Sequence, residues 1–357
     1  MENFVNSSGT TPDSTYEKFR ASYQRHHPDK TLLSFNQIKR MVARLTGIIM
    51  LTRDMCVNSC AAFTGPWKGL KQCPECGDER FEEDGITPRK VFWVFLLGPQ
   101  LQAQFLRNDG SLDYRIKATE KLLSMATGTT IELQKRTDYI HGEAYMTAVA
   151  AGKITNQSVL VMWSGDGAQL YRDKDSDIWI SIFSLLEFPP HLRYKVKHIL
   201  PDTVVPGPKA PKNHISFLFH TMYHLSALMR EGIRLWKREL EVFSLRKLFL
   251  AFACMDAVAM ASVSGWVGHH GKHGCRFMCG MPGRHKPRSP HYYPVMKLPE
   301  GYKQSGCDHP DVSRHNLTKG SPTRYSTCLH LCFVVYSDSY EGPEGTGSQA
   351  SYSGRHC

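Results

Sequence analysis

The chain has 357 residues, with 44 lysines and arginines against 33 aspartates and glutamates, and a formal net charge of +11 at pH 7. Its hydrophobic content of 41% excludes a wholly disordered protein and is sufficient for one large or two to three small domains. The positive charge favours an anionic partner, most simply nucleic acid; the alternative is a basic surface that binds nothing.

The cysteine content indicates a reducing compartment. There are eleven cysteines, an odd number that disfavours a disulfide framework. The N-terminus lacks the charged and then apolar stretch of a secretion signal, so we expect no export.

The first third of the chain predicts a polar segment, a helix and a cysteine cluster. Residues 1–34 have little periodicity and are expected to be disordered. Over residues 35–51, Ile38, Met41 and Leu45 recur at helical spacing. This helix and the cysteines that follow it are placed in one subdomain, residues 35–96.

Four cysteines have the spacing of a zinc site: Cys56, Cys60, Cys73 and Cys76. Two close pairs separated by about a dozen residues can each form a short knuckle and together supply four thiolates in a tetrahedron. Such a site stabilises a small subdomain that has little core of its own. The alternative is four unrelated free thiols.

The middle of the chain predicts helices and then strands. Residues 97–155 are expected to be a helical connector, with helices over 101–126, broken by a turn at 108–110, and over 141–151. The pattern then changes to strands over 158–165, 178–188 and 194–200, a rigid proline-rich link over 201–211, a helix over 214–240 and a further strand.

Two apolar runs each present an aspartate. Asp256 lies within residues 248–266, where a carboxylate is unfavourable unless a hydrogen bond or a cation satisfies it. Asp166 lies at the end of the run 158–167. Together they predict a divalent metal site; the alternatives are a turn residue at Asp166 and a helix N-cap at Asp256. The carboxylate inside the run 248–266 also argues against a membrane span.

The order strand, strand, strand, helix, strand is that of the opening of an RNase H-like fold. In that fold the first acid lies on strand one, and the second lies at the end of strand four beside it. Asp166 and Asp256 occupy these positions. We therefore expect an α/β protein whose RNase H-like core, a mixed sheet with helices over residues 156–300, is preceded by the small zinc-binding subdomain.

A second, looser group of metal-binding residue types follows the second acid. Its members are His269, His270, His273, Cys275, Cys279, His285 and His291. Cys275 and Cys279 would face the same way on a helical turn and could join a histidine in binding zinc. The alternative is a solvent-exposed loop. Residues 301–357 lose apolar periodicity and are expected to be a disordered tail.

Several segments resemble CACTA-type (En/Spm-like) DNA transposases, in the version found in fungal genomes. The resemblance covers about residues 36–310. The matching segments are residues 56–65 (CVNSCAAFTG), 73–77 (CPECG), 164–171 (SGDGAQLY), 205–211 (VPGPKAP), 256–260 (DAVAM), 264–266 (SGW), 268–271 (GHHG), 274–280 (GCRFMCG) and 290–294 (PHYYP). Each match is weak alone, but together and in this order they are specific.

The resemblance implies a DDE/D transposase. In that family three carboxylates hold two divalent ions for phosphodiester hydrolysis and strand transfer at transposon ends. Asp166 would be the first ligand of Mg²⁺ or Mn²⁺ and Asp256 the second. Cys275 and Cys279 match a cysteine pair that many relatives space by two residues rather than three. Double-stranded DNA as partner, a homo-oligomer and a nuclear location are also implied.

The family's third acid is expected on a later helix, and no acid near the end of this sequence has a strong helical pattern. After about residue 312 the sequence no longer resembles the family. We therefore expect a truncated and inactive copy. Two other functions remain open: a non-catalytic, zinc-containing DNA-binding remnant of a transposase, and a different carboxylate nuclease of the same fold.

Overall fold

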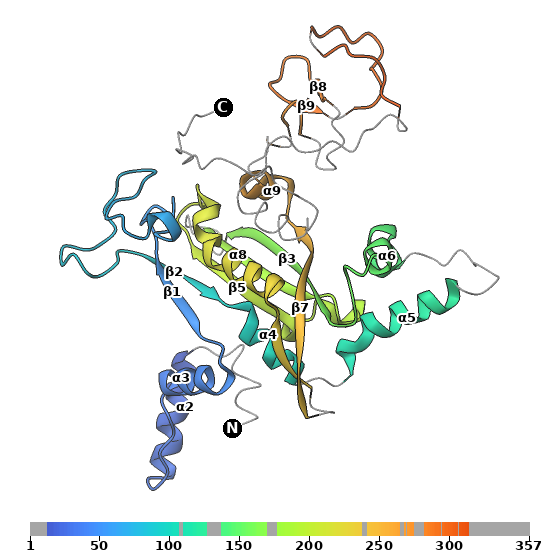
Figure 1. Cartoon of the computed structure of the whole chain (residues 1–357). Coiled ribbons are helices and arrows are strands. Elements are labelled where there is room, and N and C mark those ends of the chain that lie inside the picture. Colours follow the sequence, from blue (N-terminus) through green and yellow to red (C-terminus); the bar gives the residue numbers. More distant parts are fainter. Residues whose placement is uncertain are drawn as a thin grey trace, which may run out of the picture.

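A seven-stranded mixed sheet forms the centre of the computed structural model (Figure 1). The structure describes residues 13–106, 110–126, 137–169, 177–237, 241–264, 268, 270–274, 282–293, 295–305 and 307–313. The strands are β1 (Met50–Asp54), β2 (Val91–Phe95), β3 (Ser158–Gln169), β4 (Asp177–Leu185), β5 (Ile199–Pro206), β6 (Ile233–Lys237) and β7 (Val242–Cys254). Their order is β1-β2-β5-β4-β3-β7-β6. Strands β3 and β7 are parallel, and the other neighbours are antiparallel.

Helices cover both faces of the sheet because β3 is apolar on both sides. Its residues Val159, Val161 and Trp163 pack with α4 (Leu97–Leu106) and α8 (His214–Arg230). On the opposite face, Leu160 and Met162 pack with α5 (Tyr114–Ala126) and α6 (Glu143–Ala150). Side chains alternate along a strand, so this pattern builds a helix–sheet–helix α/β protein.

The shorter elements connect these layers or lie beyond them. They are η1 (Gly65–Trp67), η2 (Ser111–Asp113), η3 (Tyr139–His141), α7 (Pro190–Arg193), η4 (Val196–His198), α9 (Ala257–Ser264), β8 (Arg284–His285) and β9 (Tyr292–Tyr293). Strands β8 and β9 form a separate two-stranded hairpin. The connector expected over residues 97–155 does contain α4, α5 and α6.

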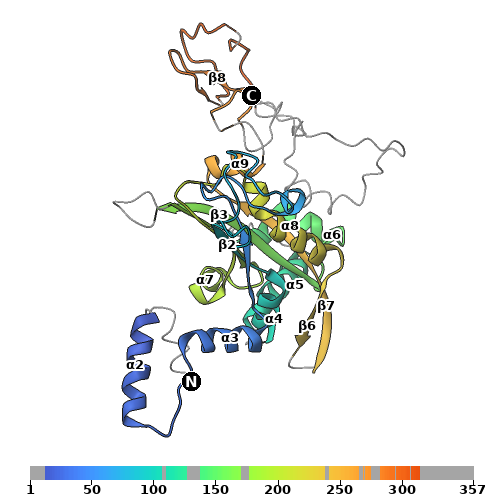
Figure 2. The same cartoon turned by 90° about the vertical axis from the view of Figure 1, so that its left-hand side faces the viewer.

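The N-terminal segment contains two helices, α2 (Asp13–His26) and α3 (Phe35–Thr46), which Figure 2 shows to one side of the sheet. The expectation of disorder is therefore wrong for α2. Its Glu17 side chain accepts a hydrogen bond from the Phe35 backbone at 3.0 Å, which joins the two helices. Helix α3 ends sooner than expected because Gly47 adopts a φ of 70°, a common way to terminate a helix.

The strand predicted over residues 194–200 lies further along the chain than expected. Within residues 194–200 the chain forms η4, with Val196 92% exposed, and strand β5 begins only at Ile199. Pro201 lies within β5, although proline has no backbone N–H to donate to a neighbouring strand. It lies beside a register shift between Ile180 and Ile182 of β4. A proline is tolerated where pairing is irregular.

The long helix expected over residues 214–240 ends at Arg230. Gly232 has a φ of 80° and turns the chain into β6, which pairs with β7. A Cβ atom at Gly232 would lie 2.8 Å from the Arg246 carbonyl oxygen, so the turn also requires a residue without a side chain. Sequence periodicity did not predict β6.

The described part of the apolar run, residues 248–264, is divided between β7 and α9. No helix in the described part of the chain is long and apolar enough to cross a membrane. Hydrogen bonds cross the boundary expected at residue 300. The buried Arg284 guanidinium donates to the carbonyls of Cys307 (3.0 Å) and His309 (2.6 Å), so packing continues past that residue. The expected tail from residue 314 lies outside the described residues.

Candidate metal centres

Strands β3 and β7 bring the two predicted carboxylates to the same edge of the sheet. Their last parallel pair is Ser164 with Cys254. Continuing this register by two residues aligns Asp166 with Asp256. Because neighbouring strands lie about 4.8 Å apart, the backbones that lead into the two aspartates leave the sheet side by side.

Each carboxylate also has a local hydrogen bond. Asp166 Oδ1 accepts from the Gly167 backbone at 2.8 Å, and Asp256 Oδ1 accepts from the Ala259 backbone at 2.6 Å, where it caps α9. Both aspartates are exposed. Asp256 is therefore at a strand–helix junction and not inside a buried apolar element, so hydration stabilises its charge.

The four cysteines of the predicted zinc site lie together. Their Sγ atoms are all within 4.8 Å of one another, and Cys56 and Cys76 are 3.5 Å apart. Four sulfurs bound to zinc at about 2.3 Å would be about 3.8 Å apart. The cluster therefore has the ligand type, number and spacing of a tetrahedral zinc site.

Tight turns produce this arrangement. The first cysteine pair is closed by a bond from the Cys56 backbone to the Ala61 carbonyl at 2.9 Å, and the second by one from the Cys73 backbone to the Asp78 carbonyl at 2.8 Å. Gly77 takes a φ of 79° in the second turn. Glycine adopts this backbone conformation without strain.

Burial governs the protonation of these thiols. It raises the pKa of Cys60 to about 12 and that of Cys73 to about 11.

 Both thiols therefore hold their protons at neutral pH when no metal is bound. Zinc must displace these protons, so its binding should weaken as the pH falls.

The cysteine cluster is an insertion into the main sheet and not a subdomain that precedes it. Strand β1 leads into the first cysteine pair, and β2 follows the second. The two strands pair with each other, and Trp93 of β2 pairs with Val204 of β5. The predicted boundary at residue 96 therefore separates strands that belong to one sheet.

The looser cysteine and histidine group is only partly described. Cys275, Cys279 and His269 lie outside the described residues. The rings of His270 and His291 stack at 4.2 Å. Within the described ranges, the four-cysteine cluster is the group of three or more residues close enough to hold a metal ion.

Sequence reasoning missed a buried carboxylate, Asp202 of β5, which is 1% exposed. Its oxygens accept hydrogen bonds from Trp163 Nε1 (3.0 Å), Ser181 Oγ (2.6 Å) and Thr221 Oγ1 (2.6 Å). These donors come from β3, β4 and α8 and satisfy the acid without a cation. The residue lay in a segment that was interpreted as a proline-rich link, so no sequence signal pointed to it.

Asp202 should make stability depend on pH. Burial raises its pKa to about 6, although the hydrogen bonds oppose this shift. An unfolded aspartate titrates near 3.9, so the stabilising contribution is full below about pH 4 and is lost as the pH rises through about 6. Asp202→Asn keeps an acceptor but does not titrate. Relative to wild type, its unfolding free energy should rise by about 3 kcal/mol between pH 4 and pH 7.

Urea unfolding of both proteins across this pH range measures the effect, with Asp113→Asn, whose side chain is half-exposed, as control. A constant difference between Asp202→Asn and wild type at every pH would contradict the assignment.

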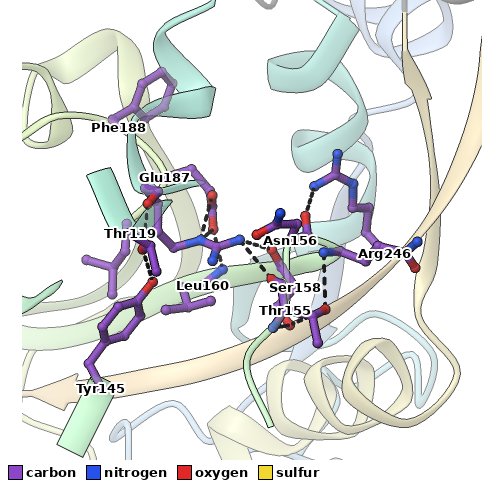
Figure 3. Close-up of polar contacts among 12 residues, drawn as sticks. Thr119, Tyr145, Thr155, Asn156, Ser158, Leu160, Glu187, Phe188 and Arg246 are labelled. Atoms are coloured by element: carbon purple, nitrogen blue, oxygen red, sulfur yellow. Dashed lines mark hydrogen bonds and ion pairs between the residues drawn. The ribbon is translucent and has the colours of Figure 1, made fainter. Parts of the chain in front are cut away.

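Buried ion pairs attach the helical connector to the end of the sheet opposite the two exposed aspartates. Arg115 Nε donates to both Glu187 oxygens, at 2.8 and 2.9 Å, and both side chains are almost fully buried. Figure 3 shows the surrounding contacts, in which the Leu160 backbone donates to Glu187 at 2.9 Å. A second buried pair joins Arg193 to Asp138 through two bonds of 3.0 Å. Both carboxylates are satisfied by nearby donors without a cation, which supports a structural role.

Comparison with known proteins found no matching family model and no significantly similar curated protein. The function is therefore inferred from the residues, their geometry and the motifs they form.

Proposed function

We propose that this chain is of the CACTA transposase type and, against the sequence-based expectation of an inactive copy, retains metal-dependent DNA nuclease and strand-transfer activity through Asp166 and Asp256. The observation that carries the proposal is the parallel pairing of β3 with β7 up to Ser164 and Cys254, each two residues before one of the aspartates. The strand order β5-β4-β3-β7, with two antiparallel pairs and then a parallel one, supports an RNase H-like core. The motif resemblance over about residues 36–310 supports the family.

The two aspartates would bind Mg²⁺ or Mn²⁺ because carboxylate oxygens are the ligands these hard cations prefer. Bound ions supply activation of water or of a 3′ hydroxyl and stabilisation of the leaving oxygen. Asp166 and Asp256 would orient them at an exposed edge that a phosphodiester can approach. The net charge of +11 favours DNA association. Nuclear location and assembly of copies on paired DNA ends would follow from this activity.

The cysteine cluster would hold Zn²⁺ in a structural role. All four ligands are protein thiolates, which leaves no open coordination position for catalysis. Its contribution would be to fold the loops between β1 and β2.

The runner-up is a non-catalytic, zinc-containing DNA-binding protein. One observation favours it: both aspartates already have backbone hydrogen bonds that account for a structural role. In addition, we assign no third carboxylate ligand within the described ranges. The two functions differ in whether a divalent cation binds at Asp166 and Asp256.

Cleavage of supercoiled plasmid in Mg²⁺ or Mn²⁺ separates the two functions. Asp166→Asn and Asp256→Asn should each reduce nicking by roughly 10²–10³-fold, the range for loss of one electrostatic stabiliser in an active site. Asp113→Asn, which changes a half-exposed carboxylate on η2, should leave nicking unchanged.

Nicking that persists in both variants would place catalysis elsewhere. If folded, zinc-loaded wild type binds DNA without nicking it, the non-catalytic function is correct.

A further inference from the structure

The turn between β5 and α8, residues 207–213 (GPKAPKN), is not used by the site proposed above. Lys209 and Lys212 are exposed on it. Pro208 and Pro211 restrict its backbone, because the proline ring fixes φ. The turn is thus a stiff segment that presents two cations to solvent.

The cysteine loop holds the C-terminal end of this turn. The carbonyl oxygen of Cys60 accepts from the backbone N–H groups of Asn213 (2.8 Å) and Lys212 (3.2 Å). Two residues further along the loop, the Ala62 backbone donates to the Ser216 hydroxyl at 2.9 Å, in the first turn of α8. A predicted zinc ligand therefore anchors the turn directly through its own backbone.

Lys90 holds the N-terminal end of the turn. Its Nζ donates to the Gly207 carbonyl at 2.7 Å and, on the cysteine loop, to the Val57 carbonyl at 3.1 Å and Ser59 Oγ at 3.2 Å. The Ser59 hydroxyl also donates to the Pro206 carbonyl at 3.2 Å. Zinc with four thiolates carries a net charge of about −2, which the nearby ammonium of Lys90 would partly balance.

The turn lies at the same edge of the sheet as the aspartates. Pro206, the last residue of β5, pairs with Ile178, and Asp166 pairs with Ile180 two residues further along β4. Strand β5 is two strands from β3, or about 10 Å. Figures 1 and 2 both show the loops between β1 and β2 near α8. Duplex DNA carries a phosphate about every 3.4 Å along each strand, so one duplex can reach both places.

We propose that the cysteine loop, when it holds zinc, fixes the turn 207–213 so that Lys209 and Lys212 contact the phosphate backbone of duplex DNA bound at the aspartate edge. This inference deepens the proposed function and rests on DNA being the substrate. Zinc then has a purpose beyond local folding, because it pre-organises a DNA contact. A contact held in place before binding loses less conformational entropy when DNA binds.

The first test measures affinity for a duplex oligonucleotide across a salt series, without Mg²⁺ or Mn²⁺ so that no cleavage occurs. In Lys209→Gln/Lys212→Gln, the slope of log affinity against log salt should become shallower by about 1.8, or about 0.9 for each lost phosphate contact. The matched control is Lys153→Gln/Lys247→Gln, which removes two exposed lysines near the start of β3 and β7, at the other end of the sheet. An equal change in both proteins would overturn the proposal.

The second test uses Lys90→Met, with zinc content checked by elemental analysis. If zinc is retained, amide exchange over residues 212–216 should rise, and the salt slope should approach that of the double-lysine variant. Unchanged exchange and unchanged affinity in zinc-loaded Lys90→Met would overturn the role of the cysteine loop, whatever the lysines do.

Failure here is distinguishable from failure of the proposed function. Normal DNA binding by the double-lysine variant, combined with nicking that depends on Asp166 and Asp256, would refute only this inference. Lysine-dependent binding without any nicking would refute only the catalytic function.

Discussion

Loss of zinc is expected to unfold the loops between β1 and β2. Cys73→Ser should purify with less than one equivalent of zinc and should unfold at a lower temperature than wild type. The apolar cluster inside these loops consists of Cys56, Cys60, Ala61, Phe63 and Cys73, with Trp67 beside it. So small a cluster needs the metal, whose binding in zinc-finger peptides contributes about 10–16 kcal/mol.

Zinc content and thermal unfolding, with and without a chelator, check this prediction. Cys254→Ser is the control because Cys254 is an exposed thiol of β7 outside the cluster. It should retain zinc and the wild-type unfolding temperature. A chelated wild-type protein that unfolds at the same temperature as the zinc-loaded one would contradict a structural metal.

Breaking the buried pair between Arg115 and Glu187 should have the largest effect of any single substitution away from the cysteines. Glu187→Ala should lower the unfolding free energy by about 3–5 kcal/mol, because it leaves the Arg115 charge buried without its partner. The Leu160 N–H would also lose its acceptor. Urea unfolding measures this loss.

A double-mutant cycle with Arg115→Met tests whether the effect belongs to the pair. The double variant should lose less than the sum of the single variants, because no isolated charge remains. The carbonyl of Ser158, which now accepts from Arg115 at 2.8 Å, limits the recovery. Lys117→Met, in an exposed pair of 3.9 Å with Asp113, should change stability by less than about 0.5 kcal/mol. Additive losses in the cycle would show that the pair is not coupled.

Local patterns in the sequence predicted several elements well. The apolar runs of β3 and β4 predicted two strands, and helical spacing predicted α3, α5 and α6. The four-cysteine spacing predicted a cluster that does come together. These predictions succeeded because each depends on residues close in sequence, whose turns and periodicity are decided locally. The metals and the transposase activity remain predictions.

Errors occurred where neighbours distant in sequence decide the structure. The alternating residues 194–200 were expected to be a strand, yet only the last two lie in β5, whose pairing with β2 and β4 buries Leu200 and Val205. The residues of β6 fit the helical pattern of the preceding segment, but Gly232 ends that pattern and pairing with β7 makes them a strand.

By itself, the sequence determined which residue types could do chemistry: two aspartates that end apolar strands and four cysteines at knuckle spacing. Only the tertiary structure decided that the chain segments leading into Asp166 and Asp256 lie side by side, through the parallel pairing of β3 with β7. It alone also revealed Asp202, whose indole donor on Trp163 lies 39 residues away, and Glu187, whose partner Arg115 lies 72 residues away. The physical reason is that a buried charge must be satisfied by groups that folding brings together, and strand register, not sequence spacing, selects them.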